Sequence, residues 1–306
     1  MLHLQQHFAA VRLLLLALFV LGASACATFH SGAMPGEPKD GIFIELNGVR
    51  VRYADQGQGP AVVLIHGFAS SLETWTVLAP ILAKDHRVIS LDLKGFGWTD
   101  RPQGDYSPGA QADLVRNLLD QLHITQADVV AHSWGCAVAL RLALQEPARF
   151  KKLVLYDAWV YAAQQPAFFR WATVPMLGEA MFAAFYKQRP EDRLNIGFYQ
   201  PDRVPQKLVD DIVAALDRPG TVAAALAAVR GQGFAQAERE YARISQPTLL
   251  LWGREDGVSL PDFAARLAGD IAGSRLEWFD HCGHFPMLEA ANASNAAVQQ
   301  FLRVAQ

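Results

Sequence analysis

The sequence predicts an α/β protein with a mostly parallel eight-stranded sheet, helices flanking the sheet, and a helical cap inserted late in the chain. Two observations support this prediction. Short β-rich runs alternate with helical patterns from residue 42 onward, and such alternation is typical of parallel sheets. The stretch between Tyr156 and Pro247 has helical periodicity and no convincing strand. With 306 residues and 51% hydrophobic composition, the chain can bury a large core.

Charge and cysteine content exclude several other classes of protein. Charged residues make up only 19% of the chain, which is unlike a disordered protein. The net charge is -3 and there is no basic block, so we expect no nucleic-acid partner. Three cysteines, Cys26, Cys136 and Cys282, are too few for a disulfide framework. We expect Cys136 and Cys282 to be buried free thiols, with a disulfide between them as the alternative.

Residues 1–25 have the pattern of a secretory signal peptide. One charge, Arg12, precedes an apolar run from Leu13 to Leu21, and small residues then lead to Cys26. This ending resembles the lipobox of bacterial lipoproteins, which implies an acylated Cys26 and a membrane anchor. Plain secretion or an uncleaved anchor is the alternative. We therefore expect residues 26–41 to be a tether and the protein to lie in the cell envelope. In a Gram-negative host this means the outer membrane or periplasm.

The strands of the main domain, residues 42–306, can be assigned in order. Asn47 and Gly48 join the first two runs as a hairpin, so the leading edge should be antiparallel. The later runs are continuously apolar and should be buried on both faces. The helical cap is expected over residues 158–238. The eight predicted strands are Ile42–Glu45, Val49–Ala54, Ala61–Ile65, Arg87–Leu91, Asp128–Ala131, Lys152–Tyr156, Pro247–Leu251 and Arg275–Phe279.

Ser133 is the candidate nucleophile. It lies where a predicted strand runs into a helix, and Ala131 and Gly135 are small at the positions two before and two after it. A sharp turn of this kind needs small neighbours, because larger side chains would collide there. The alternative is that Ser133 only caps the helix.

A serine nucleophile also needs a base and an acid that orients the base. His284 follows the last strand and precedes the final helix, and it is the predicted base. His281 is the lesser alternative. The acid should follow a strand between serine and histidine, and we favour Asp256. Glu255 and Asp157 are the alternative acids.

Two backbone N–H groups must bind the oxyanion that forms during acyl transfer. One is expected from Trp134, directly after the nucleophile. The other is expected from Phe68, because Gly67 allows the loop after the third strand to turn. His281, Cys282 and His284 could suggest a metal site, but the chain has no second ligand cluster. We predict neither a metal nor a cofactor.

Taken together, these motifs resemble the α/β-hydrolase superfamily over residues 42–304. The His132-x-Trp134-Gly135 frame is similar to that of epoxide hydrolases and haloalkane dehalogenases, which carry aspartate where this chain has Ser133. Serine implies acyl transfer instead. The Gly-Pro-Gly loop common in C–C bond hydrolases is absent. The matching segments are His66-Gly67-Phe68, residues 92–100, the Ser133 elbow, Trp252-Gly253 with Asp256, and Gly283-His284.

The resemblance implies a serine hydrolase that cleaves carboxylic esters through an acyl-enzyme. Ten aromatic residues lie among residues 159–199. Some should line an apolar pocket, while packing within the cap accounts for most of them. We therefore expect esters of apolar or aromatic small molecules as substrates. The alternatives are a C–C bond hydrolase, an amide hydrolase or a perhydrolase of the same fold, and a membrane-anchored binding module without turnover.

Overall fold

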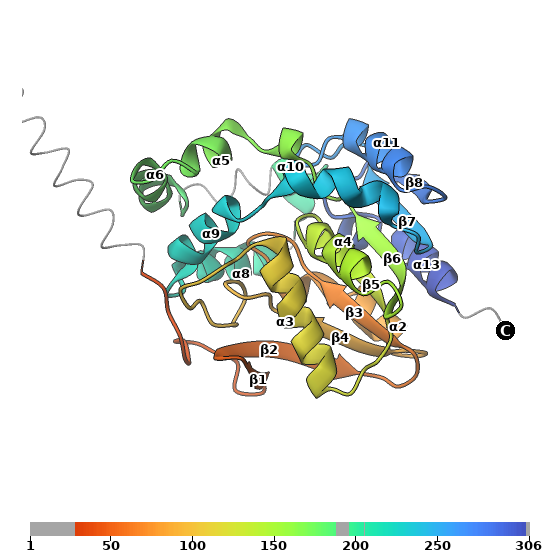
Figure 1. Cartoon of the computed structure of the whole chain (residues 1–306), viewed down its shortest axis with the longest axis horizontal. Coiled ribbons are helices and arrows are strands. Elements are labelled where there is room, and N and C mark those ends of the chain that lie inside the picture. The colour runs from red at the N-terminus through yellow and green to blue at the C-terminus, as the bar shows by residue number, and fades with distance from the viewer. Residues whose placement is uncertain (1–27, 188–195, 205, 304–306) are drawn as a thin grey trace, which may run out of the picture.

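A computed structural model describes residues 28–187, 196–204 and 206–303. Eight strands form one sheet in the order β1-β2-β4-β3-β5-β6-β7-β8 (Figure 1). β2 is antiparallel to both β1 and β4, and the remaining neighbours are parallel. The predicted sheet and its antiparallel edge are thus confirmed. The strands are β1 (Ile42–Leu46), β2 (Val49–Gln56), β3 (Ala61–Ile65), β4 (Arg87–Leu91), β5 (Ala127–His132), β6 (Phe150–Tyr156), β7 (Thr248–Gly253) and β8 (Arg275–Phe279).

Helices cover both faces of the sheet, and alternate residues of each central strand contribute to different layers. Val62 and Leu64 of β3 belong to one buried cluster, and Val63 and Ile65 to the other. The first cluster includes η1 (Leu72–Trp75), α2 (Leu78–Leu82), α12 (Pro286–Glu289) and α13 (Ala291–Leu302). The second includes α3 (Pro108–Gln121), α4 (Gly135–Gln145) and α11 (Pro261–Asp270). Burial on both faces explains the continuously apolar strands.

The carboxyl ends of the central strands meet at one edge of the sheet. Ile65 of β3 is paired with Ala131 of β5. His132 of β5 is paired with Tyr156 of β6, which is paired in turn with Leu251 of β7. This register brings the residues that follow β3, β5, β6 and β7 close together, although they are far apart in the sequence.

The described residues between β6 and β7 contain helices and no strand, as predicted. They have a small core of their own, in which Phe182 stacks on Phe168 and on Tyr186 at ring distances of 5.2 and 5.1 Å. These aromatic residues therefore pack the cap. The elements are η2 (Ala162–Gln164), α5 (Ala167–Ala172), α6 (Leu177–Phe185), η3 (Pro201–Arg203), α8 (Gln206–Asp217), α9 (Thr221–Arg230), α10 (Phe234–Ala237) and η4 (Glu238–Arg243).

The cap also packs against two loops of the main domain. The Phe68 ring, after β3, lies 5.5 Å from the Phe169 ring of α5. The Phe285 ring, after β8, stacks on the Phe198 ring at 4.7 Å. In the described part of the chain, no single helix is long and apolar enough to cross a membrane. The pair Val209–Asp217 and Thr221–Arg243, bent by 92°, meets the length and composition test only when its members are taken together.

The segment expected to act as a tether lies against the domain from Phe29 onward. The Phe29 ring stacks on that of Tyr106 at 6.0 Å, and the His30 and Arg101 backbones exchange two hydrogen bonds. Met34 is buried. Apolar residues among the Gly and Pro positions explain why this segment packs. Residues 1–27, including Cys26, lie outside the described residues, so the signal peptide and the acylation site stay predictions.

Candidate active site

Ser133 occupies a strained turn between β5 and α4. Its φ of +52° is unusual for a residue with a side chain. Gly135 is required two residues later, because a Cβ there would lie 2.3 Å from the His66 carbonyl oxygen. The Ser133 amide donates to the Tyr156 carbonyl oxygen at 2.9 Å, which ties the turn to β6. This is the backbone geometry that the small neighbours of Ser133 predict for a nucleophile.

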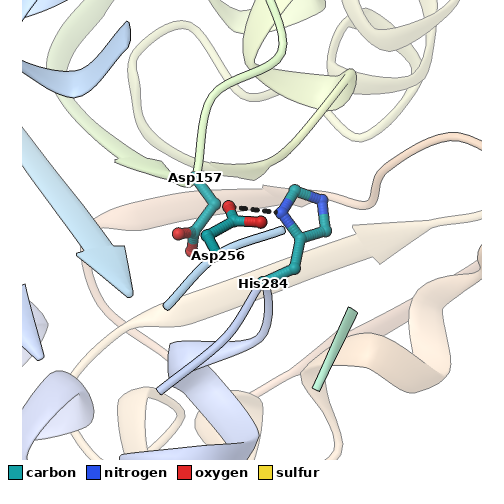
Figure 2. Close-up of side chains that lie close together, drawn as sticks. All are labelled: Asp157, Asp256 and His284. Carbon is teal, nitrogen blue, oxygen red and sulfur yellow. Dashed lines mark hydrogen bonds and ion pairs between the residues drawn. The ribbon is translucent and has the colours of Figure 1, made fainter. Parts of the chain in front are cut away.

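His284 and Asp256 form a buried hydrogen-bonded pair (Figure 2). The His284 Nδ1 atom lies 2.8 Å from Asp256 Oδ2. Asp256 Oδ1 accepts from the amides of Val258 and Ser259 at 2.7 and 2.9 Å. A carboxylate only accepts hydrogen bonds, so Nδ1 carries the proton and Nε2 of neutral His284 keeps a free lone pair. This tautomer can accept a proton from a hydroxyl group.

The alternatives considered for the acid and the base lie elsewhere. Glu255 is exposed, and its Oε2 accepts from the Cys282 amide rather than from a histidine ring. His281 is exposed and lies against the Tyr199 ring. Asp157 is completely buried at the end of β6, and its Oδ1 accepts from the Gly253 amide at 2.9 Å. Of these carboxyl groups, Asp256 is the one that holds the His284 ring.

The residue before the nucleophile connects the Ser133 turn to the histidine loop. The buried His132 Nε2 donates to the His284 carbonyl oxygen at 2.8 Å, and the two rings lie 4.7 Å apart. Burial, followed by repulsion from His284, holds the pKa of His132 well below its usual value. His132 is therefore neutral and acts as a donor. Sequence reasoning placed His132 in the elbow motif but missed this contact.

Glu289 of α12 holds the histidine loop from the other side, and sequence reasoning missed it as well. Its carboxylate accepts from the amides of Gly283, Phe285 and Tyr199 at 3.0, 3.3 and 2.8 Å. The His284 amide donates to the carbonyl oxygen of Gly197 in the cap at 2.6 Å. A half-buried acid five residues after His284, in a short helix that is otherwise apolar, was the available sequence signal.

The loops that carry Phe68 and Trp134 lie side by side. Their rings contact at 6.3 Å, and a Cβ on Gly67 would lie 3.0 Å from the Ser133 Cβ. Among the described residues, neither the Phe68 nor the Trp134 amide donates to a protein acceptor. The Phe68 loop and the residue after Ser133 thus lie together, as an oxyanion site at Ser133 would require.

Asp157, Asp256 and His284 also form a cluster whose ligand atoms lie within 4.8 Å of one another. Such a spacing can suit a cation. Two of the three ligand atoms, His284 Nδ1 and Asp256 Oδ2, however, lie 2.8 Å apart and already form a hydrogen bond with each other. The cluster is better described as a histidine with one bonded carboxylate and a second carboxyl group behind it (Figure 2).

Two adjoining cavities lead toward this site. The smaller, about 330 Å³, is lined by Phe68, which offers the oxyanion amide, and by Phe285, which follows His284. The larger, about 850 Å³, shares Phe198 and Leu288 with it and extends toward His281. The smaller cavity touches both the loop after β3 and the loop after His284. Its lining combines apolar residues such as Phe68, Phe198 and Phe285 with charged ones such as Arg52, Glu73 and Arg218.

Comparison with known proteins identifies the fold family. Residues 60–291 match the alpha/beta hydrolase fold family. An uncharacterised protein of Mycobacterium tuberculosis is 32% identical over 260 residues, or 80% of this chain and 75% of that protein. A 2-hydroxymuconate semialdehyde hydrolase of a Pseudomonas species is 31% identical over 282 residues, which are 88% of this chain and 96% of that protein.

A solved structure has a similar fold. The meta-cleavage product hydrolase of Pseudomonas fluorescens has a TM-score of 0.73 and 27% identity, covering 85% of this chain and 97% of that one. The match to the family spans more than half of the 306 residues and includes Ser133 and Asp256. The chain therefore belongs to the α/β-hydrolase fold family.

Proposed function

We propose that the protein is a serine hydrolase that cleaves carboxylic esters of apolar or aromatic small molecules. The observation that carries the proposal is a serine at a strained turn whose preceding residue, His132, contacts the His284 of a His284–Asp256 pair. In the mechanism, Ser133 Oγ attacks the ester carbonyl while His284 Nε2 accepts its proton. His284 then returns that proton to the leaving alcohol, which leaves an acyl-enzyme on Ser133.

The rest of the site supports both halves of the reaction. The Phe68 and Trp134 amides are free to bind the oxyanion of each tetrahedral intermediate. Water attacks the acyl-enzyme in the second half, with His284 again as base and then as acid. Asp256 stays ionised and stabilises the imidazolium that forms in both halves. The apolar wall formed by Phe68, Phe198 and Phe285 favours an apolar or aromatic substituent on the ester.

A second candidate function is hydrolysis of a C–C bond. It is favoured by the relatives named 2-hydroxymuconate semialdehyde hydrolase and meta-cleavage product hydrolase. The loop at Gly67, Phe68 and Ala69, which lacks proline, favours the ester reaction over this candidate.

Two experiments test the proposal. A fluorophosphonate should label the purified protein stoichiometrically at Ser133, because only an activated serine reacts rapidly. Absence of labelling would favour a binding module without turnover. A panel of p-nitrophenyl esters from acetate to palmitate should then be run beside an amide and a ring-fission product. Turnover of the ring-fission product with no ester hydrolysis would select the C–C bond reaction instead.

We also propose that the protein is anchored in the cell envelope through an acylated Cys26. Support comes from the sequence alone, namely the apolar run from Leu13 to Leu21 and the small residues that precede the cysteine.

A further inference from the structure

Asp157 is a buried carboxyl group that the proposed mechanism does not use. It directly follows β6 and lies beside Asp256, as Figure 2 shows, and its side chain is completely buried. Its backbone has a φ of +44°, which is costly for a residue with a side chain. A buried acid in a strained position beside the catalytic acid calls for a physical explanation.

The hydrogen bonds of the two carboxyl groups are unequal. Asp256 accepts from the Val258 and Ser259 amides and from the His284 ring. Asp157 Oδ1 accepts from the Gly253 amide, and no donor among the described residues reaches its Oδ2. Three donors stabilise an anion on Asp256, whereas Asp157 has one. A negative charge therefore belongs on Asp256.

Two negative charges could not coexist here at neutral pH without a compensating cation. Within the described chain, neither carboxyl group forms an ion pair with lysine or arginine. Burial, followed by the negative charge of Asp256, holds the pKa of Asp157 well above its usual value. The other titratable groups around Asp157 are Cys136 of α4, Tyr156 of β6, Cys282 and His284 of the last loop, and Glu289 of α12.

We propose that Asp157 is a neutral carboxyl group whose Oδ2–H donates a hydrogen bond to the Asp256 carboxylate. This proposal rests on the proposed function, because it assigns Asp157 as a positioning residue for the catalytic acid. The proton stays on Asp157 throughout the reaction, so the acid–base unit carries a single negative charge. That charge matches the single positive charge of the His284 imidazolium. The donated bond orients Asp256, and Asp256 in turn orients the His284 ring.

Two substitutions of similar size test whether Asp157 acts by donating a hydrogen bond to Asp256. Asp157→Asn keeps an oxygen for the Gly253 amide and an N–H for Asp256, so kcat should stay within about threefold of wild type. Asp157→Leu removes the donor, and kcat should fall about tenfold to a hundredfold with KM nearly unchanged, as expected for a lost bond to a charged group. Asp256→Asn is the reference variant, and its kcat should fall by about 10⁴-fold.

Two kinetic outcomes would overturn the proposal. If Asp157→Asn is as damaging as Asp256→Asn, Asp157 is needed as an anion. If Asp157→Leu retains wild-type kcat, the donated bond does not position the acid.

A spectroscopic measurement keeps the proposal testable if Asp157→Leu does not fold. The infrared spectrum of the wild-type protein at neutral pH should contain a protonated-carboxyl band that is missing in Asp157→Asn. A wild-type spectrum without that band would refute a neutral Asp157. The measurement needs no substrate, so its result is separate from fluorophosphonate labelling of Ser133, on which the proposed function depends.

Discussion

The His132 imidazole donates a hydrogen bond of 2.8 Å to the main-chain carbonyl of His284. His132, which directly precedes Ser133, therefore holds the loop that carries His284. His284 is the base that we expect to deprotonate Ser133. Because the bond goes to the backbone, it leaves the His284 ring free to bond Asp256 and to face the substrate. A buried neutral histidine next to Ser133 thus holds the loop that carries His284.

Removing the nucleophile or the base should abolish turnover without unfolding the protein. Ser133→Ala and His284→Ala should each lower kcat by about 10⁴-fold or more on the best ester, because the members of such a unit act together. Steady-state kinetics and thermal melts of both variants check this. A folded variant of either kind with near-wild-type turnover would show that the triad assignment is wrong.

Acid should destabilise the protein through His132. Its folded-state pKa is depressed by burial, so the stability it contributes is full above the unfolded value of about 6.5 and is lost as the pH falls below it. The loss is at most about 1.4 kcal/mol per pH unit. His132→Gln keeps a donor near the Nε2 position and does not titrate. Urea unfolding at pH 7 and pH 5 should therefore show that His132→Gln loses less free energy of unfolding at the lower pH than the wild type does. An equal loss in the two proteins would contradict the prediction.

Asp157 should have the opposite effect on stability. The pKa of Asp157 is raised in the folded state. Its contribution to stability is therefore full below the pKa of about 3.9 in the unfolded chain, and it declines as the pH rises toward the pKa in the folded state. Asp157→Asn removes this titration. The melting temperature of Asp157→Asn relative to wild type should accordingly rise between pH 5 and pH 8. A difference that does not change with pH would show that Asp157 ionises normally in the folded protein.

Glu289 should be needed to position His284. Glu289→Ala leaves three amides around the histidine loop without their acceptor, and should cost about 2 kcal/mol or more of stability and lower kcat. Glu289→Gln retains one acceptor oxygen and should lie between Glu289→Ala and wild type. Glu240→Ala, which breaks surface ion pairs, is the matched control and should change neither quantity appreciably. If Glu289→Ala behaves like Glu240→Ala, the loop is held by other contacts.

Cys26 should carry two acyl chains in the mature protein. Burying such chains contributes about 0.8 kcal/mol per CH₂, so detergent should release the protein from membranes while salt and alkaline washes should not. Intact mass decides the matter, and Cys26→Ser is the control that removes the acylation site. A mature N-terminus elsewhere, or at Cys26 without acyl mass, would rule out lipidation and leave the catalytic argument unaffected.

The strands could be predicted from the sequence because burial on both faces produces uninterrupted apolar runs. Ala61–Ile65 and Arg87–Leu91 coincide with β3 and β4, and the less buried edge strand Arg275–Phe279 coincides with β8. The choice between Asp157 and Asp256 was harder, since each follows a parallel strand, β6 or β7, and these two strands are neighbours paired at Tyr156 and Leu251. Only the positions of the donors around each carboxyl group distinguish the two.

Contacts made through the backbone were beyond sequence reasoning. The bonds from His132 to the His284 carbonyl and from the His284 amide to Gly197 involve main-chain groups that every residue has, so no residue type marks them. The packing of Phe29 on Tyr106 was missed for a related reason. Gly and Pro positions predict a flexible segment, yet one aromatic residue can attach such a segment when a partner ring is exposed nearby.

The bonds between the cap and the histidine loop couple the position of the cap to that of His284. The Gly197 carbonyl accepts from the His284 amide, and the Tyr199 amide donates to Glu289, which also holds that loop. A cap movement that widens the entrance must either break both bonds or carry His284 along with it. The open form would then hold a misaligned base, and closure over a substrate would restore it. Water that enters the open form would thus find His284 misaligned, so that hydrolysis would not proceed there.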